Sequence, residues 1–407
     1  MLSRVISAIR IRKLIPSSFT FMASVYLLTF FVILPRTCRH LPYSVYFEES
    51  LAAQLQTAIH QHQQRVDSET DYFVKMSRQH RHEYTNRLMN NTNEVIVVVV
   101  TSQRTVANVG SGYLTQVMAA FDRILRSGND FRHGVAIFMC NIDGGRRGHE
   151  EALWLADYFP MISRFPDSDA RTVSIQNPEK QREDYIFCLN ATLRYAAKYV
   201  LMVEDDAVPK HDFFSVMDHV LDQKISRIWR RGELVANEEW AYVKFYYPDR
   251  WRSYGSDIMT TLEVAATGLL GGAATLWLTL FTSSRFPFHV DSIAVFISAS
   301  IYFGLISVLI GRPHVQQWRR ISPDLYTAVS APECCIPSVL YPKSVIGELI
   351  GHLTAATCRS DPVDIVIDRY FARKSYARYL IEPNLFKHRG MYSSIKGMSV
   401  HPGMFLD

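Results

Sequence analysis

The stretch Tyr199–Pro209, YVLMVEDDAVP, sets the expected architecture of this chain. An apolar run leads directly into three consecutive carboxylates, Glu204, Asp205 and Asp206. A buried strand that ends in an acidic cluster is costly unless a positive group neutralises the charge. Pro209 ends the strand, so the carboxylates lie at its C-terminal end, where open α/β sheets bind their ligands. A divalent metal ion that bridges the phosphates of a nucleotide is the simplest cation that fits.

Strands and helices alternate before this stretch. Residues 94–104, EVIVVVVTSQR, are rich in β-branched side chains and predict the first buried strand of a parallel sheet. A helix over 113–125, a strand over 135–143 and a helix over 182–198 follow, and residues 171–176, RTVSIQ, are a further candidate strand. We therefore expect an α/β fold with a mostly parallel sheet flanked by helices.

Three apolar segments approach the length needed to cross a bilayer. The first, Ser17–Leu34, follows a basic N-terminal segment and predicts an uncleaved anchor, with a cleaved signal peptide as the alternative. Residues 262–281 and 293–310 predict a transmembrane hairpin, with a buried hairpin of a soluble core as the alternative. Four glycines supply small surfaces for close helix packing: Gly268, Gly271, Gly272 and Gly304.

The composition changes along the chain divide it into six parts. They are a cytosolic N-terminus (1–16), a transmembrane anchor (17–35), a helical lumenal stem (36–92), the first part of a catalytic domain (93–260), the transmembrane hairpin (261–311) and the second part of the catalytic domain (312–407). The stem carries His60, His62, His80 and His82 without regular carboxylate or cysteine partners, so we expect a solvated helical face and no metal site there.

The charge and the cysteines exclude some classes of protein. The net charge of +5 is mild and no dense basic patch is interleaved with aromatics, which argues against a nucleic-acid surface. The six cysteines include no CxxC pair, which argues against structural zinc. Candidate disulfides are Cys140–Cys188 and a bridge from Cys334 or Cys335 to Cys358, or a bond between the vicinal pair, while Cys38 stays free.

Polar residues outside the acidic triplet are further candidates for a nucleotide site. Thr101, Ser102 and Arg104 follow the first strand and could contact a base, ribose or phosphate. No GxGxxG fingerprint is present, which disfavours a dehydrogenase. Asp184 lies near the start of the helix before the acidic strand, where a favourable helix-end charge is the simpler interpretation and a nucleotide contact the alternative.

Two acids of the C-terminal part share one face of a predicted helix. Asp364 and Asp368 stand four residues apart, and like charges at that spacing cost stability unless one is protonated, paired or used as a base. One interpretation is a catalytic base that deprotonates an acceptor hydroxyl. The other is an ion pair between Asp368 and Arg369 or Arg373.

Together these features resemble a known enzyme family. The VVVVTSQR strand, the EDD triplet and the tail DPVDIVIDRYF…IEPNLFKHRGMYSSIKG resemble GT-A glycosyltransferases, and the tail is similar to that of the N-acetylglucosaminyltransferase IV family. The whole chain, with a hairpin inside the catalytic domain, resembles the Golgi GPI-N-acetylgalactosamine transferases that act after GPI attachment. The resemblance implies a GT-A-like fold and a multi-pass Golgi membrane protein with a lumenal catalytic domain.

The resemblance also implies roles for particular residues. It assigns Glu204, Asp205 and Asp206 to the metal and diphosphate motif, with His388 completing the site of a divalent ion such as Mn²⁺. It places Asp364 as the base, with Asp368 as the second catalytic candidate. It sets Cys335, Pro337 and Ser338 near the sugar or the acceptor.

The reaction implied is inverting transfer of N-acetylgalactosamine from UDP-GalNAc to a mannose of the glycan on GPI-anchored proteins. The first alternative is an N-acetylhexosaminyltransferase that acts on N-glycan or lipid-linked acceptors. The second is a non-catalytic membrane scaffold, which is disfavoured because the interiors of the apolar segments lack ionisable residues and Glu263 lies only at an edge.

Overall fold

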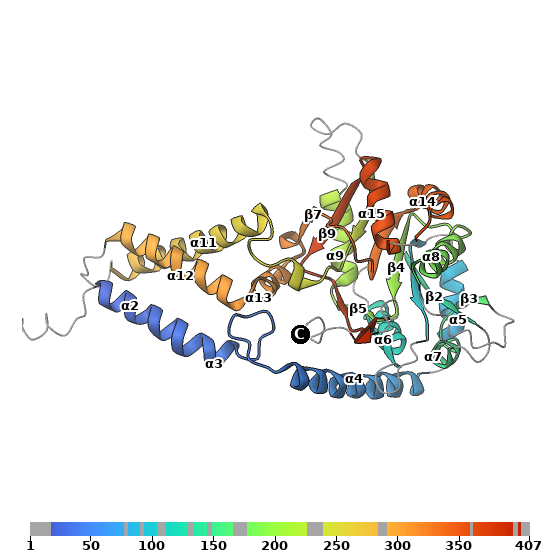
Figure 1. Ribbon diagram of the computed structural model, residues 1–407, viewed down its shortest axis with the longest axis horizontal. Helices are drawn as coiled ribbons and strands as arrows, with labels where there is room; N and C mark the ends of the chain where they lie inside the picture. The colour runs from blue at the N-terminus through green and yellow to red at the C-terminus, as the bar shows by residue number, and fades with distance from the viewer. Residues whose placement is uncertain are drawn as a thin grey trace, which may run out of the picture. The chain divides into compact units, whose positions relative to one another are not determined.

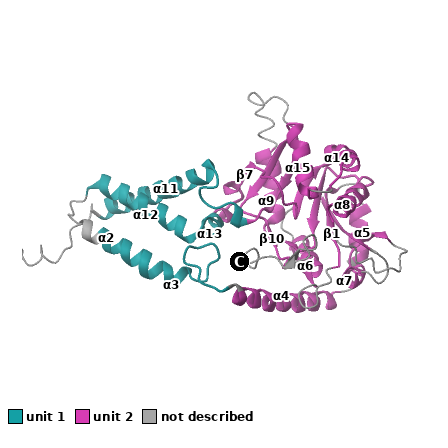
Figure 2. Ribbon diagram, viewed as in Figure 1, with its two compact units in different colours: residues 1–50, 249–318, 407 teal, residues 51–248, 319–406 magenta. Residues whose placement is uncertain are grey.

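The chain forms two compact units, and each draws on two separate stretches of sequence. The computed structural model of the protein describes residues 18–76, 80–89, 93–103, 111–127, 134–144, 149–165, 177–225, 239–283, 291–358, 361–393 and 398–399. Unit 1 takes in residues 1–50 and 249–318, and unit 2 takes in residues 51–248 and 319–406 (Figure 2). The stretch expected as a stem therefore divides between the units at residue 50.

Unit 2 is built on a mixed sheet that has eight strands in the described part of the chain (Figure 1). The strands are β1 (Asn93–Thr101), β2 (Gly134–Gly144), β3 (Met161–Phe165), β4 (Tyr199–Glu204), β6 (Trp240–Lys244), β7 (Thr327–Ser330), β8 (Ser338–Pro342) and β9 (Ala377–Glu382), in the order β3-β2-β1-β4-β8-β6-β9-β7. The pairings from β3 to β4 and the β6–β9 pairing are parallel. Strand β8 runs antiparallel to β4 and β6, and β7 runs antiparallel to β9. The predicted parallel arrangement is thus confirmed for the first four strands.

Helices cover both faces of this sheet because alternate side chains of each strand point to opposite sides. Val95, Val97 and Val99 of β1 join one core, and Ile96 and Val98 join the other. The first core is covered by α4 (Leu51–Val74), α6 (Tyr113–Arg126), α7 (Glu150–Leu155) and α9 (Phe213–His219), and the second by α8 (Pro178–Thr192), α14 (Lys343–Ala355) and α15 (Val363–Arg373). Helix α5 (His80–Met89) contributes to both. The result is a three-layer α/β/α unit.

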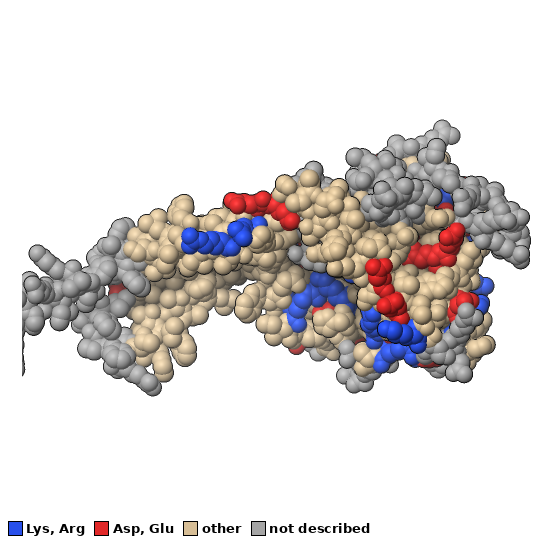
Figure 3. All heavy atoms as spheres, turned by 90° about the horizontal axis from the view of Figure 1, so that it is seen from below, with Lys and Arg blue, Asp and Glu red and all other residues tan. Residues whose placement is uncertain are grey.

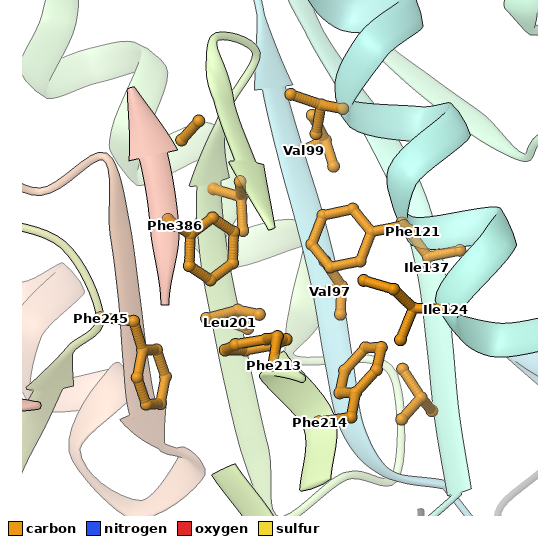
Figure 4. Close-up of a cluster of buried hydrophobic side chains, with 14 of the residues drawn as sticks. Val97, Val99, Phe121, Ile124, Ile137, Leu201, Phe213, Phe214, Phe245 and Phe386 are labelled. Carbon is orange, nitrogen blue, oxygen red and sulfur yellow. The ribbon is translucent and has the colours of Figure 1, made fainter. Parts of the chain in front are cut away.

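A small two-stranded sheet joins distant parts of unit 2. Strand β5 (Ala207–Pro209) follows β4 directly and pairs antiparallel with β10 (Phe386–His388). Figure 4 shows Phe386 among the rings of Phe121, Phe213 and Phe245, and its centroid lies 4.7 Å from that of Phe213. This aromatic anchor fixes β10 beside the end of β4. A further pair, β11 (Tyr392–Ser393) and β12 (Met398–Ser399), follows β10.

Unit 1 contains the apolar helices. They are α2 (Ser18–Leu28), a π-helical turn (Thr29–Ile33), α3 (Leu34–Cys38), α11 (Ile258–Ser283), α12 (Ser292–Ile310) and the short α13 (Arg312–Gln316). Helices α11 and α12 are long and apolar enough to cross a membrane, and the N-terminal apolar helix is shorter. In Figure 3, uncharged side chains cover most of the visible surface over these helices.

The helices of unit 1 are held together by small residues and hydrogen bonds. A Cβ on Gly268 would lie 2.6 Å from the carbonyl oxygen of Ser300, so α11 and α12 approach closely there. The predicted use of glycine in packing is confirmed for Gly268, Gly271 and Gly272 but not for Gly304, where a Cβ would make an ordinary contact. The N-terminal helix joins the hairpin through Thr29 Oγ1, which lies 2.8 Å from the hydroxyl of Tyr302. The expected anchor and hairpin therefore form one bundle within unit 1.

The remaining local predictions concern one strand and the disulfides. The segment that follows α7 forms strand β3, which the sequence analysis missed, and the candidate strand at 171–176 lies outside the described residues. The predicted Cys140–Cys188 disulfide is present and ties β2 to α8. Of the alternatives for Cys334 and Cys335, the vicinal bond forms, and Cys38 and Cys358 make no disulfide among the described cysteines.

Candidate active site

The acidic triplet splits between two directions at the end of β4. Glu204 is the last residue of β4, and Asp205 and Asp206 form the turn that leads into β5. One ligand atom each of Glu204, Asp206 and His388 lies within 4.8 Å of the others. Asp205 is outside this group.

His388 reaches the carboxylates because β10 pairs with β5. Its backbone stands opposite Ala207, and its Nε2 lies 3.4 Å from Oδ2 of Asp206. The imidazole stacks on Tyr246 with the ring centroids 5.6 Å apart, and its Nδ1 is buried without a hydrogen-bond partner among the described residues. The ring is therefore fixed in place by packing.

The turn after His388 closes over Asp206. The backbone N–H of Arg389 donates to the carbonyl oxygen of Asp206 over 2.7 Å. A Cβ on Gly390 would lie 2.0 Å from Oδ2 of Asp206, so only glycine fits beside this carboxylate. Burial, together with the nearby Arg65, lowers the pKa of Arg389 to about 9.

Two carboxylates and an imidazole suit a hard or borderline divalent ion such as Mn²⁺. Asp206 is only 2% exposed, and a buried carboxylate beside a second one requires a positive partner. The donor set of Glu204, Asp206 and His388 thus fits the implied metal, and it differs from the full EDD triplet that the resemblance suggests.

Asp205 instead ties β4 to the end of β1. Its Oδ2 accepts hydrogen bonds from Thr101 Oγ1 over 2.8 Å and from the Ser102 N–H over 3.2 Å. His149 Nε2 lies 2.6 Å from Thr101 Oγ1 on the other side. Arg104, the third candidate after this strand, lies outside the described residues.

A small pocket opens beside Asp205 and Thr101. Its lining consists of Ser102, Gln103, Ser111, Tyr113, His149, Glu150, Glu151 and Asp205. Glu151 accepts the backbone N–H groups of Gly112 over 3.0 Å and Thr115 over 2.7 Å at the start of α6, and burial raises its pKa. Sequence reasoning missed His149 and Glu151, although the acidic start of the helix at GHEEALW is a visible signal.

Asp184 does not line this pocket. It is 1% exposed, and its carboxylate forms an ion pair with Lys180 over 2.8 Å. It forms a second ion pair with Arg164, the next-to-last residue of β3. Its charge is therefore satisfied within the fold. The expected helix-start role is wrong, because α8 begins at Pro178 and Asp184 lies beyond its first turn.

A loop joins the metal-ligand cluster to Asp364. The Glu204 N–H donates to the Pro337 carbonyl over 2.9 Å, and two residues earlier the Cys335 N–H donates to Asp364 Oδ2 over 2.7 Å. Ser338 begins β8 and pairs with Val203. Cys335, Pro337 and Ser338 therefore lie between the two carboxylate groups.

A buried pair of tyrosines belongs to the second core. The hydroxyls of Tyr185 and Tyr341 are 2.9 Å apart. Burial raises the pKa of Tyr185 well above its usual value, and the charges of Tyr341, Glu204 and Asp364 add to that shift. Glu204 and Asp364 thus act on the same hydroxyl from separate elements.

Asp368 occupies a closed polar cluster. It is 1% exposed, lies 3.1 Å from Lys244 Nζ and 3.2 Å from Arg378 Nη1, and accepts from the hydroxyl of Tyr242. The ion pair expected with Arg369 or Arg373 is replaced by these partners from β6 and β9. Its lone pairs are therefore engaged, whereas Asp364 is partly exposed.

Lys244 links this cluster to the vicinal disulfide. Its Nζ donates to the carbonyl oxygens of Pro332 over 2.9 Å and Cys334 over 2.7 Å. Burial lowers the pKa of Lys244, and the charge of Asp368 opposes that shift. Asp368 thereby supports, through Lys244, the same loop that contacts Asp364.

Comparison with known protein families agrees with this geometry. The family model described as GPI-N-acetylgalactosamine transferase PGAP4 matches residues 95–387, a range that includes most of β1, the EDD triplet, the hairpin and α15. Since the match covers well over half of the sequence, the chain belongs to the PGAP4 family of GPI-N-acetylgalactosamine transferases.

Proposed function

We propose that the protein transfers N-acetylgalactosamine from UDP-GalNAc to a mannose of the GPI glycan, with inversion at the anomeric carbon. The observation that carries this proposal is the loop Cys334–Ser338, which connects a metal-ligand cluster at Glu204 to a separate carboxylate at Asp364. An inverting transfer needs these two parts, one for the leaving group and one for the incoming hydroxyl.

Glu204, Asp206 and His388 would hold the divalent ion. When bound, this ion supplies positive charge that stabilises the departing diphosphate. The chain's own contribution is to hold the three ligands in place through the β5–β10 pairing and the Gly390 turn.

The pocket beside Asp205 supports the binding of the uridine part. Ser102 and Gln103 at the end of β1, and Ser111 and Tyr113 at the start of α6, offer backbone groups, a hydroxyl and an aromatic ring. The pocket shares the acidic segment with the metal-ligand cluster, so a nucleotide there would direct its phosphates toward the cluster.

Asp364 would act as the base. It removes the proton of the acceptor hydroxyl while the hydroxyl oxygen bonds to the anomeric carbon and the bond from that carbon to the UDP oxygen breaks. The Cys335 N–H holds one carboxylate oxygen over 2.7 Å, and the N–H of Ile365 approaches the other over 2.9 Å. Partial exposure leaves this carboxylate accessible to an acceptor.

The membrane and compartment assignments belong to the same proposal. Helices α11 and α12 suit a multi-pass protein, and the Cys140–Cys188 disulfide suits an oxidising lumen. A Golgi enzyme with a lumenal catalytic unit would meet GPI-anchored proteins at the bilayer surface.

The test is transfer by the purified full-length chain from UDP-GalNAc to a GPI-mannose acceptor, with and without a chelator. Asp206→Ala should abolish metal-dependent transfer, and Asp364→Asn should lower kcat by about 10²–10⁴-fold, the usual contribution of a general base. Asp361→Asn is the matched control, because Asp361 is exposed and pairs with Arg369. Retained transfer in Asp364→Asn would exclude Asp364 as the base. A preference for UDP-GlcNAc or for an N-glycan acceptor would favour an N-acetylhexosaminyltransferase that acts on N-glycan or lipid-linked acceptors.

A further inference from the structure

Helix α4, expected as part of a solvated stem, packs on the loop that follows β10. Ala58 and Ile59 of α4 form an apolar cluster with Tyr113 and Met391. His62, expected on a solvated face, is only 5% exposed, because these neighbours cover it. The prediction of a solvated face was therefore wrong at His62 and holds for His60, which is exposed.

His62 connects α4 to the start of α6. Its Nε2 lies 2.8 Å from the carbonyl oxygen of Ser111, so this nitrogen donates, and its Nδ1 lies 3.3 Å from Gln116 Nε2. The imidazole also lies against the ring of Tyr113, with centroids 4.5 Å apart. One histidine thus fixes both the backbone before α6 and the first side chain of that helix.

Helix α4 packs tightly against the start of α6. A Cβ on Gly112, which has a φ of +88°, would lie 2.3 Å from Cγ2 of Val66. Arg65 Nε donates to Gln116 Oε1 over 3.2 Å one turn further along. Close backbone approach and paired polar groups at one place indicate a fixed orientation of α4 on α6.

Tyr113 connects the α4–α6 contact to the turn beside the candidate metal site. Its hydroxyl accepts the backbone N–H of Met391 over 3.2 Å. The other end of the same turn is held by the Arg389 N–H on the Asp206 carbonyl, and Gly390 between them lies against the Asp206 carboxylate. Tyr113 also lines the pocket beside Asp205.

We propose that α4 is a positioning element of the metal and donor site, acting through His62 and Tyr113 on the Gly390–Met391 turn. This inference rests on the proposed metal site at Glu204, Asp206 and His388. Without the Tyr113 hydroxyl, the Met391 end of the turn loses its hydrogen bond, while the Arg389 end keeps its bond to Asp206. Helix α4, which was expected as part of the stem, is then a positioning element of the candidate site and not a spacer.

The experiment uses the purified full-length chain and compares Tyr113→Phe with Tyr72→Phe. Tyr72 is the control, because it is a tyrosine of α4 whose hydroxyl bonds to Asp122 of α6, away from the turn. The readouts are amide hydrogen exchange in a peptide covering residues 386–393 and Mn²⁺ affinity from the magnetic resonance signal of free Mn²⁺. Tyr113→Phe should speed exchange in that peptide and weaken Mn²⁺ binding by about fivefold, the effect of losing one ordinary hydrogen bond. His62→Asn should act in the same direction, and His60→Asn should leave both readouts unchanged.

The outcomes separate this inference from the proposed function. Unchanged exchange or unchanged Mn²⁺ affinity in Tyr113→Phe would overturn it, and so would an equal shift in Tyr72→Phe, which would indicate general loss of stability. A wild-type chain that binds Mn²⁺ but transfers no sugar would remove the proposed function, while the binding comparison would still decide the role of α4. A wild-type chain that binds no Mn²⁺ would overturn both.

Discussion

At the scale of single residues, the shape of the candidate metal site depends on a position without a side chain. Gly390 lies between Asp206 and His388, and an added Cβ would come within 3.0 Å of His388 Cε1 as well as 2.0 Å of the Asp206 carboxylate. Two ligands would therefore have to move apart. Distances at a metal site tolerate changes of only a few tenths of an ångström.

We expect Gly390→Ala to lower transfer activity by at least about 100-fold and to weaken Mn²⁺ binding, because a misplacement near 1 Å has that effect on catalysis. Gly347→Ala in α14 is the control, since its Cβ would meet nothing within 4 Å. Titration with Mn²⁺ and thermal melting of both variants check this. Normal Mn²⁺ affinity in Gly390→Ala would contradict the ligand set.

Asp143, at the end of β2, predicts a pH dependence of stability. Burial raises its pKa from the usual 3.8 to about 6, although the Gln103 N–H and Lys180 favour the charged form. Between these two values the folded state binds more protons than the unfolded state, so stability falls as pH rises from about 4 to about 6. Above that range the cost of the buried charge is fully present.

Asp143→Asn should therefore melt at a higher temperature than the wild type at pH 7.5, and the difference should shrink as pH falls toward 4. The amide oxygen can still accept from Gln103, so the hydrogen bond is retained. Melting curves over this pH range provide the measurement. A difference that does not change with pH would show that the charge of Asp143 is not the cause.

At the scale of elements, Lys244 fastens β6 to α15 and to the vicinal disulfide. Its side chain and that of Asp368 are each 1% exposed. Removing one member of a buried pair leaves the other charge uncompensated, which costs about 3–5 kcal/mol.

Lys244→Met should lower the free energy of unfolding of unit 2 by about 3 kcal/mol or more. Lys198→Met is the control, because the Lys198–Glu94 pair lies at the surface and should have no measurable effect. Thermal and denaturant unfolding compare the two. Equal stability would mean that Tyr242 and Arg378 satisfy Asp368 without the lysine.

The elements also show which features the sequence could predict. The β-branched run of β1 and the apolar run before Glu204 gave correct strands, because burial on both faces leaves a continuous apolar pattern. Strand β3, MISRF, was missed because it is short, mixed in polarity and only partly buried. The antiparallel position of β8 between β4 and β6 follows from tertiary pairing and leaves no local signal.

The site was predictable to a similar degree. Acidic residues at the end of a strand identified Glu204 and Asp206, and the tail identified His388, which the structure places beside them. The separation of Asp205 from its neighbours arises in the turn after β4, where Asp205 bonds to Thr101 and Ser102, so strand alternation could not have predicted it. The burial of His62 and the partners of Asp368 could not, because each depends on which distant elements pack together.

At the scale of the whole molecule, the hairpin of unit 1 depends on close contact between its two helices. Gly268 faces the backbone of Ser300, whereas a Cβ on Gly304 would meet Val264 at an ordinary 3.8 Å. Backbone atoms in a helix cannot move to relieve a clash in the way that a flexible side chain can. Arg312, the first residue of α13 just after α12, pairs with Glu263 of α11 over 2.7 Å.

Gly268→Ala should push α11 from α12 and increase amide hydrogen exchange in both helices, while Gly304→Ala should leave exchange near the wild-type level. Peptides from β1 and β4 serve as an internal reference, since they belong to unit 2. Equal exchange in the two variants would show that the helices are not held by this contact.

The pairing of β5 with β10 also sets an order in time. The ribosome makes β5 before α11 and α12, and it makes β10 after them. At roughly 5–20 residues per second, about ten seconds or more separate the two strands. A nascent chain thus completes α11 and α12 while it carries Glu204 and Asp206 but not yet His388. On the proposed function, a fragment released before β10 is synthesised would lack His388 and be inactive even with its first four strands folded.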